Sequence, residues 1–108
     1  MRYKIEITQE AQKHFESILS LNPQYAEAWN SIGLIICNQG KGDLEKAMQY
    51  YNKALLLDPD LESALINSLD VFNATGDKNN FLKYLKRLYK LAPNNPQLVP
   101  MYRSFKLI

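Results

Sequence analysis

The stretch NQGKGDLEKA, residues 38–47, places Lys41 between two glycines directly before a run with helical character, an arrangement that could hold a phosphate. A phosphate-binding P-loop has the pattern G-x-x-x-x-G-K-[ST], because backbone N–H groups, a lysine and a hydroxyl must converge on one phosphate chain. Here six residues separate Gly33 from Gly40, and Gly42 follows Lys41 where Ser or Thr is required. The stretch therefore fails as a P-loop in both spacing and chemistry.

The same glycines do not form a dinucleotide-binding loop either. In the motif G-x-G-x-x-G a third glycine would follow Gly40 and Gly42, but Glu45 occupies that position. We interpret the stretch as a helix end followed by a helix start. Gly40 is suited to the left-handed residue after a helix, Gly42 to a second sharp bend, and Asp43 to the N-cap of the next helix.

Residue types that catalyse reactions are few. His14 has no serine or cysteine in a recognised arrangement and fits the solvated surface of a helix. Cys37 has no identifiable activating base and fits a small apolar filler near the end of a helix. One histidine and one cysteine cannot form an all-His/Cys zinc site within this chain. The sequence predicts a protein that is not an enzyme and that uses no cofactor or metal.

Three acidic residues, Asp58, Asp60 and Glu62, gather around Pro59. They resemble neither a calcium-binding EF-hand loop nor a pair of catalytic carboxylates, because Pro59 separates them at the entrance of a predicted helix. We expect an electrostatic role, since carboxylates complement the positive N-terminal end of a helix.

The charge of the chain is unevenly distributed. Residues 1–77 contain six Lys and Arg and all eleven acids, whereas the chain from Lys78 onward contains seven cations and no acid. Four of these cations share one face of a predicted helix: Lys83, Lys86, Arg87 and Lys90. Such a stripe is usually a solvated face, but an uncompensated positive field attracts phosphate backbones and acidic proteins. Binding of RNA or another anionic surface is therefore an alternative function.

The overall composition is that of an ordinary soluble globular protein. With 108 residues, 46% hydrophobic and 22% charged, the chain is long enough for one compact domain. Apolar runs such as LIIC at 34–37 are far shorter than the roughly 18 residues of a membrane-spanning helix, and the N-terminus lacks the apolar segment of a signal peptide. A single cysteine cannot form an internal disulfide, so we predict a reducing, cytoplasmic location.

An internal repeat organises the chain. Pro23, Pro59 and Pro93 end similar phrases, LSLNP, LLLDP and YKLAP, and lie 36 and 34 residues apart, which is the period of a helical hairpin repeat. The middle unit follows the pattern W-x₂-L-G-x₂-Y…A-x₃-F…P closely. The matching residues are Trp29, Ile32, Gly33, Ile36, Ala47, Tyr51, Ala54 and Pro59. The chain thus resembles the tetratricopeptide repeat (TPR) family.

The physical basis of this pattern is helix packing. The first four matching residues fall at i, i+3, i+4 and i+7, which places them on one face of a helix. Gly33 costs about 1 kcal/mol of helix propensity, so we expect a packing reason for it, namely the close approach of another helix. In the second helix, Ala47 and Ala54 are small where backbones come near, and Tyr51 fills the gap beside them.

The resemblance implies an all-α fold of TPR-like antiparallel helical hairpins, stacked as a short right-handed α-solenoid of about six helices. Aligned on the prolines, the chain divides into an incomplete repeat, a well-matched repeat with a two-residue insertion in its turn, a degenerate repeat and a closing helix. These are residues 1–23, 24–59, 60–93 and 94–108, respectively. The incomplete repeat supplies only a second helix, at residues 8–21, and the closing helix is expected from Pro96 to Ile108.

Residues 1–7 fit this scheme poorly. Apolar Tyr3, Ile5 and Ile7 alternate with charged residues, a period of two that is typical of a strand. Two interpretations stay open: an ordered extension that covers the first helix, or a remnant of a cut from a longer protein.

In TPR proteins the first helices of successive hairpins line a concave groove that holds a peptide or helix of another protein. The resemblance implies a non-enzymatic scaffold that binds a partner protein in this way. The groove would be lined by Glu27, Asn30, Leu34, Cys37, Asn38, Ser63, Ile66, Asn67, Asp70 and Asn73. One TPR subclass clamps a chaperone's C-terminal carboxylate with lysine, arginine and asparagine. Its cations are missing here, which disfavours that ligand, because the corresponding positions carry Asn30, Leu34, Asn67, Gln97 and Met101. An uncovered first helix also predicts self-association, because terminal repeats normally need a cap.

Overall fold

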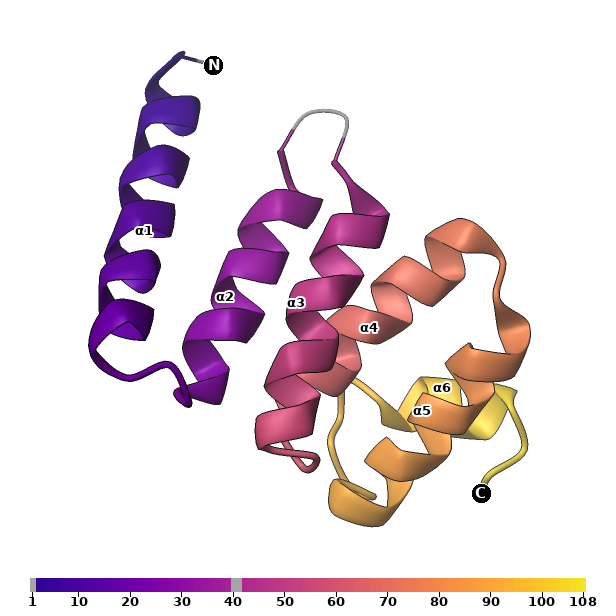
Figure 1. Cartoon of the computed structure of the whole chain (residues 1–108). Helices are drawn as coiled ribbons and strands as arrows, with labels where there is room; N and C mark the ends of the chain where they lie inside the picture. The colour runs from indigo at the N-terminus through magenta and orange to yellow at the C-terminus, as the bar shows by residue number, and fades with distance from the viewer. Residues whose placement is uncertain (1, 40–41) are drawn as a thin grey trace.

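The computed structural model describes residues 2–39 and 42–108, with side chains from Thr8 onward. The predicted helix end at Gly40 and the neighbouring Lys41 lie outside the described residues. The described part of the chain folds into six α-helices and contains no strand, so the predicted all-α fold of about six helices is confirmed (Figure 1). The helices are α1 (Arg2–Leu21), α2 (Ala26–Cys37), α3 (Leu44–Leu57), α4 (Glu62–Thr75), α5 (Lys78–Leu91) and α6 (Val99–Ser104).

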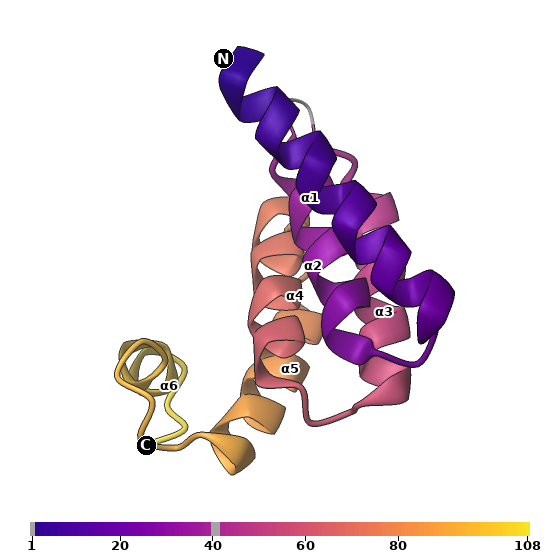
Figure 2. The same ribbon diagram turned by 90° about the vertical axis from the view of Figure 1, so that its left-hand side faces the viewer.

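Consecutive helices from α1 to α5 pack side by side. α1 packs against α2, α2 against α3, α3 against α4, and α4 against α5, while α2 also touches α4. Figures 1 and 2 show the row of helices running from α1 at one end to α6 at the other. The contact between α2 and α4 places the first helices of successive hairpins next to each other, as the resemblance implies.

The helix junctions repeat the same turn. The side-chain Oδ1 of Asn22 accepts the N–H of Gln24 at 3.3 Å, and Oδ1 of Asp58 accepts the N–H of Asp60 at 3.2 Å. A proline follows each of these two acceptors, and such side-chain turns stabilise the bend between helices. At the third junction Ala92 has no side-chain acceptor, but the backbone bond of the turn recurs. The N–H groups of Tyr25, Leu61 and Asn95 donate to the carbonyl oxygens three residues earlier at 3.2, 3.1 and 3.3 Å. The repeating proline phrases are therefore repeating turns.

Two helix starts and one helix end are set by local residues, and the predicted N-cap at Asp43 is among them. The carboxylate of Asp43 accepts the N–H of Lys46 at 2.9 Å at the start of α3, and that of Asp77 accepts the N–H of Asn80 at 3.2 Å at the start of α5. α4 ends at Gly76. The φ of this residue, 73°, is left-handed, a backbone conformation that glycine adopts more easily than other residues.

Two helices differ in length from the prediction. α1 begins at Arg2 rather than at residue 8, because extending an existing helix is easier than starting a new element, and this outweighs a short alternating pattern. α6 is confined to Val99–Ser104 within the predicted helix from Pro96 to Ile108. It starts late because residues 96–98 form a turn, and it ends before Lys106, whose φ of 61° is not helical.

The apolar side chains form two adjoining clusters. In the described residues the first cluster joins α2, α3 and α4 and comprises Ile32, Ile36, Ala47, Tyr51 and Val71. The second cluster extends from α2 to α6 and comprises Ala26, Ala54, Leu55, Ala64, Leu65, Leu69, Leu85, Leu88, Leu98 and Tyr102.

Gly33 has the packing role expected of it. A Cβ at this position would lie 2.7 Å from Cε1 of Tyr51 and 3.1 Å from the carbonyl oxygen of Ala47. The ring of Tyr51 therefore rests directly on the backbone of α2, and the absence of a side chain at Gly33 lets α3 approach this closely.

Candidate functional site

The ten residues predicted to line a groove lie on α2, just beyond its end at Asn38, and on α4. Their spacing of three or four residues puts each set on one face of its helix. Because α2 and α4 pack against each other, the two sets adjoin. We call this surface the α2–α4 face.

Three of the ten residues hold the two helices together. Asn30 Nδ2 donates to Ser63 Oγ at 3.0 Å, and Asn67 Nδ2 donates to Asn30 Oδ1 at 3.0 Å. Asn30 is only 7% exposed, so its amide is a buried link between α2 and α4 rather than a free contact for a partner. A buried amide whose oxygen and nitrogen are both bonded fixes the relative position of the helices.

Other residues of the α2–α4 face are open to solvent. Leu34 is 39% exposed although it is a large apolar side chain, and Ser63, Asp70 and Asn73 are exposed on α4. Glu27 is also exposed and accepts a hydrogen bond from the hydroxyl of Tyr25 at 3.3 Å. The remaining members range from half-buried to exposed: Cys37, Ile66 and Asn67 are half-buried and Asn38 is exposed.

The complete burial of the Tyr51 hydroxyl was not predicted from the sequence. The side chain of Tyr51 is 0% exposed, and its hydroxyl has no hydrogen-bond partner in the described part of the chain. Burial, with added effects of Cys37 and Asp70, raises the pKa of Tyr51 above its ordinary value. Desolvation by the surrounding helices likewise raises the pKa of Asp70, although its side chain reaches solvent. Burial therefore makes the charged form of each group less favourable than it is in water.

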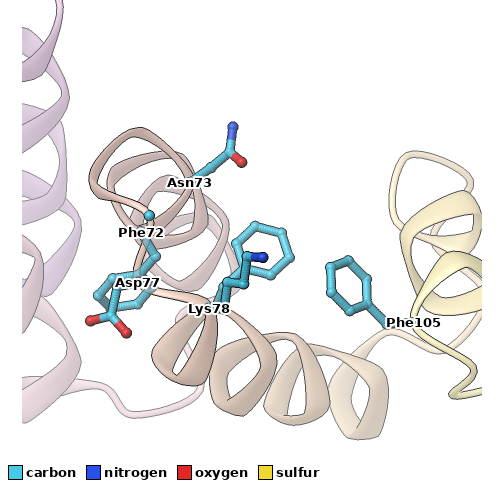
Figure 3. Close-up of a pocket in the computed structure, with 7 residues that line it drawn as sticks. Phe72, Asn73, Asp77, Lys78 and Phe105 are labelled. Atoms are coloured by element: carbon cyan, nitrogen blue, oxygen red, sulfur yellow. The ribbon is translucent and has the colours of Figure 1, made fainter.

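A cavity of about 350 Å³ opens beside the end of α4. Figure 3 shows Asn73 from α4, Lys78 from α5 and Phe105 from the end of α6 around this space. Asn73 also belongs to the α2–α4 face, so the cavity adjoins that face. We call it the aromatic pocket; its lining residues are Phe72, Asn73, Gly76, Asp77, Lys78, Phe81 and Phe105.

The four predicted basic residues lie together on α5. They line, with Asn79 and Leu82, a hollow of about 350 Å³. Lys83, Lys86 and Lys90 are exposed. Arg87 differs, because its Nη2 donates to the carbonyl of Pro59 at 2.9 Å and its guanidinium lies 5.0 Å from the ring of Tyr84. This residue links α5 to the turn after α3.

The side chains first considered for chemistry have ordinary structural surroundings. His14 is exposed and stacks edge-on to Phe15 at 5.6 Å. Glu62 accepts a hydrogen bond from Asn95 at 2.7 Å, which ties the start of α4 to the turn before α6. No group of three or more His, Cys, Asp or Glu in the described residues is placed to hold a metal ion. Nor does any helix in that part of the chain have the length and apolar character needed to cross a membrane.

Comparison with known families decides the identity of the fold. The model of the family described as "Tetratricopeptide repeat" matches residues 8–69, more than half of the chain. The chain belongs to the TPR family. A TPR fold is a scaffold for contacts between proteins, and TPR proteins are typically not enzymes. The matched region covers most of α1, the whole of α2 and α3, and the first part of α4, so the basic helix α5 lies beyond it.

Relatives and a solved structure agree with this assignment. The chain is 33% identical over 79 residues to the Photosystem I assembly protein Ycf3 of Rippkaea orientalis, an alignment that covers 60% of this chain and 44% of that protein. It is 24% identical over 98 residues to Ycf3 of Cyanophora paradoxa, covering 78% and 57%. The chain thus spans about half the length of these curated relatives.

The crystal structure of YrrB, described as a TPR protein with an unusual peptide-binding site, superposes with a TM-score of 0.73 at 19% identity. That match covers 94% of this chain and 51% of YrrB. At this identity the similarity concerns the fold.

Proposed function

We propose that this TPR chain is a non-enzymatic interaction module that binds a peptide or helical segment of a partner protein on the α2–α4 face. The observation that carries the proposal is the exposure of Leu34, 39%, beside the bonded amide of Asn30. An exposed apolar side chain on helices that a buried polar link holds in place offers a partner apolar burial on a surface that is already ordered.

The relatives support a role in assembling larger complexes. The Ycf3 proteins are named as assembly proteins of Photosystem I, and a chain that holds one subunit's segment while another is added needs binding surfaces more than catalysis. We infer that this chain likewise presents its α2–α4 face to a segment of a protein under assembly. The proposed division into repeats at 24–59 and 60–93 fits this role, because each repeat contributes one helix to the face.

A selection experiment tests the proposal. Random dodecapeptides displayed on phage are selected on the immobilised chain, and the strongest binder is titrated by calorimetry. We expect Leu34→Asp to weaken binding by about tenfold, which corresponds to about 1.4 kcal/mol. Leu56→Asp is the matched control, because Leu56 is 75% exposed on α3 and outside the α2–α4 face. Equal affinity of the Leu34 and Leu56 variants would show that the peptide does not bind on the α2–α4 face.

The hollow on α5 supports a second candidate function, the binding of RNA or another anionic surface. Three exposed lysines line it, and no acid occurs from Lys78 onward to neutralise them. On a heparin column, Lys83→Glu with Lys86→Glu should elute at clearly lower salt than the wild type. Lys13→Glu with Lys46→Glu makes the same change of charge elsewhere on exposed sites and is the control. Equal elution of the two variants contradicts this candidate.

Two further proposals concern the state of the chain. A second copy would pack against α1, at whose end Leu21 is 88% exposed, and sedimentation velocity should then show a dimer that Leu21→Asp weakens. A sedimentation coefficient that keeps the value of a monomer at every concentration contradicts this proposal.

We also propose a cytoplasmic location, in keeping with the free thiol of Cys37.

A further inference from the structure

The aromatic pocket has walls that are already held in place. Phe72 is 8% exposed, and its ring meets that of Tyr84 edge to face at 4.8 Å. Phe81 and Phe105 lie with their ring centroids 5.3 Å apart at a tilt of 34°. Aromatic pairs at these separations attract each other, so the walls do not need to rearrange before a guest enters.

The open side of the pocket is apolar and accessible. Phe105 is 44% exposed, and no atom other than those of its two chain neighbours lies within 4 Å of where a Cβ of Gly76 would be. The cavity of about 350 Å³ is large enough to hold several waters. Three phenylalanines in contact with such water gain free energy when an apolar side chain replaces it.

The rim carries two opposite charges, Asp77 and Lys78, and only the positive one is free to pair with a guest. The carboxylate of Asp77 accepts two hydrogen bonds from Asn80, from the backbone N–H at 3.2 Å and from Nδ2 at 2.8 Å, so it is occupied in capping α5. Lys78 is exposed and forms no ion pair with the described residues, and the chain beyond it carries only positive charges. Asn73 adds an amide on the α4 side of the rim (Figure 3).

We propose that the aromatic pocket is a subsite for a large apolar side chain, phenylalanine or leucine, that has an aspartate or glutamate beside it in a partner's segment. The apolar side chain packs against the exposed faces of the phenylalanine rings, and the neighbouring carboxylate pairs with the ammonium group of Lys78. This subsite rests on the proposed function, because Asn73 belongs both to the pocket and to the α2–α4 face. It specifies the chemistry of the segment that this face would bind.

Designed peptides test this subsite. The probe is an acetylated Gly/Ser heptapeptide whose central phenylalanine is flanked by aspartate and glutamate, titrated into the ¹⁵N-labelled chain up to about 5 mM, a range suited to millimolar binding. We expect saturable shifts at Asn73, Gly76 and Lys78. Replacing the central phenylalanine by alanine, or the two acids by lysines, should weaken binding by about fivefold or more.

Variants of the chain complete the test. Phe105→Ala should weaken the acidic peptide by about fivefold or more, and Lys78→Glu should reverse the preference so that the lysine-flanked peptide binds better. Lys13→Glu, an equal change of charge at an exposed lysine of α1, should have no effect. A cooperative unfolding transition above the titration temperature in all three variants shows that the fold is retained.

Three results would overturn the subsite: no shifts at the highest peptide concentration, binding that is indifferent to Phe105→Ala, or a preference for the lysine-flanked peptide in the wild-type chain. A dimer seen by sedimentation and lost in Phe105→Ala would also overturn it, since a second copy would then be the occupant. Failure of the subsite is separable from failure of the proposed function. In the former case, phage-selected peptides remain sensitive to Leu34→Asp but not to Phe105→Ala or Lys78→Glu.

Discussion

The amide oxygen of Asn30 accepts a hydrogen bond from Nδ2 of Asn67 at 3.0 Å, which joins two helices whose residues lie 37 positions apart in the chain. The amide nitrogen of Asn30 donates to the hydroxyl of Ser63, so both ends of this buried amide are hydrogen-bonded. The α2–α4 face is therefore built on a specific polar link and not only on apolar packing.

This link predicts the effect of removing it. Asn30→Ala leaves Asn67 and Ser63 without their partner, and we expect the free energy of unfolding in urea to fall by about 1–3 kcal/mol. The double variant Asn30→Ala with Asn67→Ala should lose less than the sum of the two single variants, since the residues share one bond. Additive losses would show that the bond contributes nothing.

The close approach of α2 and α3 predicts a cost for any side chain at Gly33. Gly33→Ala gains about 1 kcal/mol of helix propensity, but its Cβ collides with Tyr51, so we expect a net loss of about 1–3 kcal/mol. Gly76→Ala provides a comparison, because it meets no atom within 4 Å and loses stability only through its positive φ of 73°. Combining Gly33→Ala with Tyr51→Leu should recover part of the loss. A Gly33→Ala variant with raised melting temperature contradicts this packing.

The buried hydroxyl of Tyr51 predicts a dependence of stability on alkaline pH. Burial raises the pKa of Tyr51 above its ordinary value of 10.0, so near this pH the unfolded chain loses the proton while the folded chain keeps it. The free energy of unfolding therefore falls as the pH rises above about 10. Tyr51→Phe should reduce this loss and raise the free energy of unfolding at neutral pH by up to about 1 kcal/mol.

Tyr25→Phe is the control for this titration, since Tyr25 is 41% exposed. Urea unfolding of the two variants and the wild type at a series of pH values gives the comparison. Parallel curves for Tyr51→Phe and the wild type above pH 10 would contradict the assignment.

The basic residues of α5 should separate into two groups. Arg87→Ala removes the bond to Pro59 and the contact with Tyr84, and we expect a loss of about 0.5–1.5 kcal/mol in the free energy of unfolding. Lys83→Ala, Lys86→Ala and Lys90→Ala should each change it by less than about 0.5 kcal/mol, because these side chains are exposed. Thermal unfolding of the four variants measures the difference, and equal losses would contradict the distinction.

Features that depend on neighbouring residues could be predicted from the sequence. The N-cap at Asp43, the helix end at Gly76 and the close packing at Gly33 follow from residue type and spacing, so the TPR-like hairpins were predictable as well. The helical start at Arg2 was not, because an alternating pattern over a few residues cannot reveal that a helix behind it will extend.

Features that depend on packing between distant segments were out of reach. The spacing puts Asn30 on the α2–α4 face, but only the contact with α4 shows that it is buried and bonded. In the same way, the charge of Arg87 suggested a basic surface, whereas its bond to Pro59 depends on how α5 lies beside the earlier turn. Phe105 meets Phe81 because the end of α6 folds back onto α5. Neither segment alone has a sequence pattern that predicts the aromatic pocket.

The most direct test of the central claim is a map of amide shift changes when a phage-selected peptide is titrated into the ¹⁵N-labelled chain, which at 12.5 kDa is well suited to solution spectra. If the partner segment binds on the α2–α4 face, the largest changes fall there, at Leu34, Asp70 and Asn73, and continue into the aromatic pocket at Lys78. Changes concentrated instead on the exposed surfaces of α3 and α5, around Leu56 and Lys86, would contradict it.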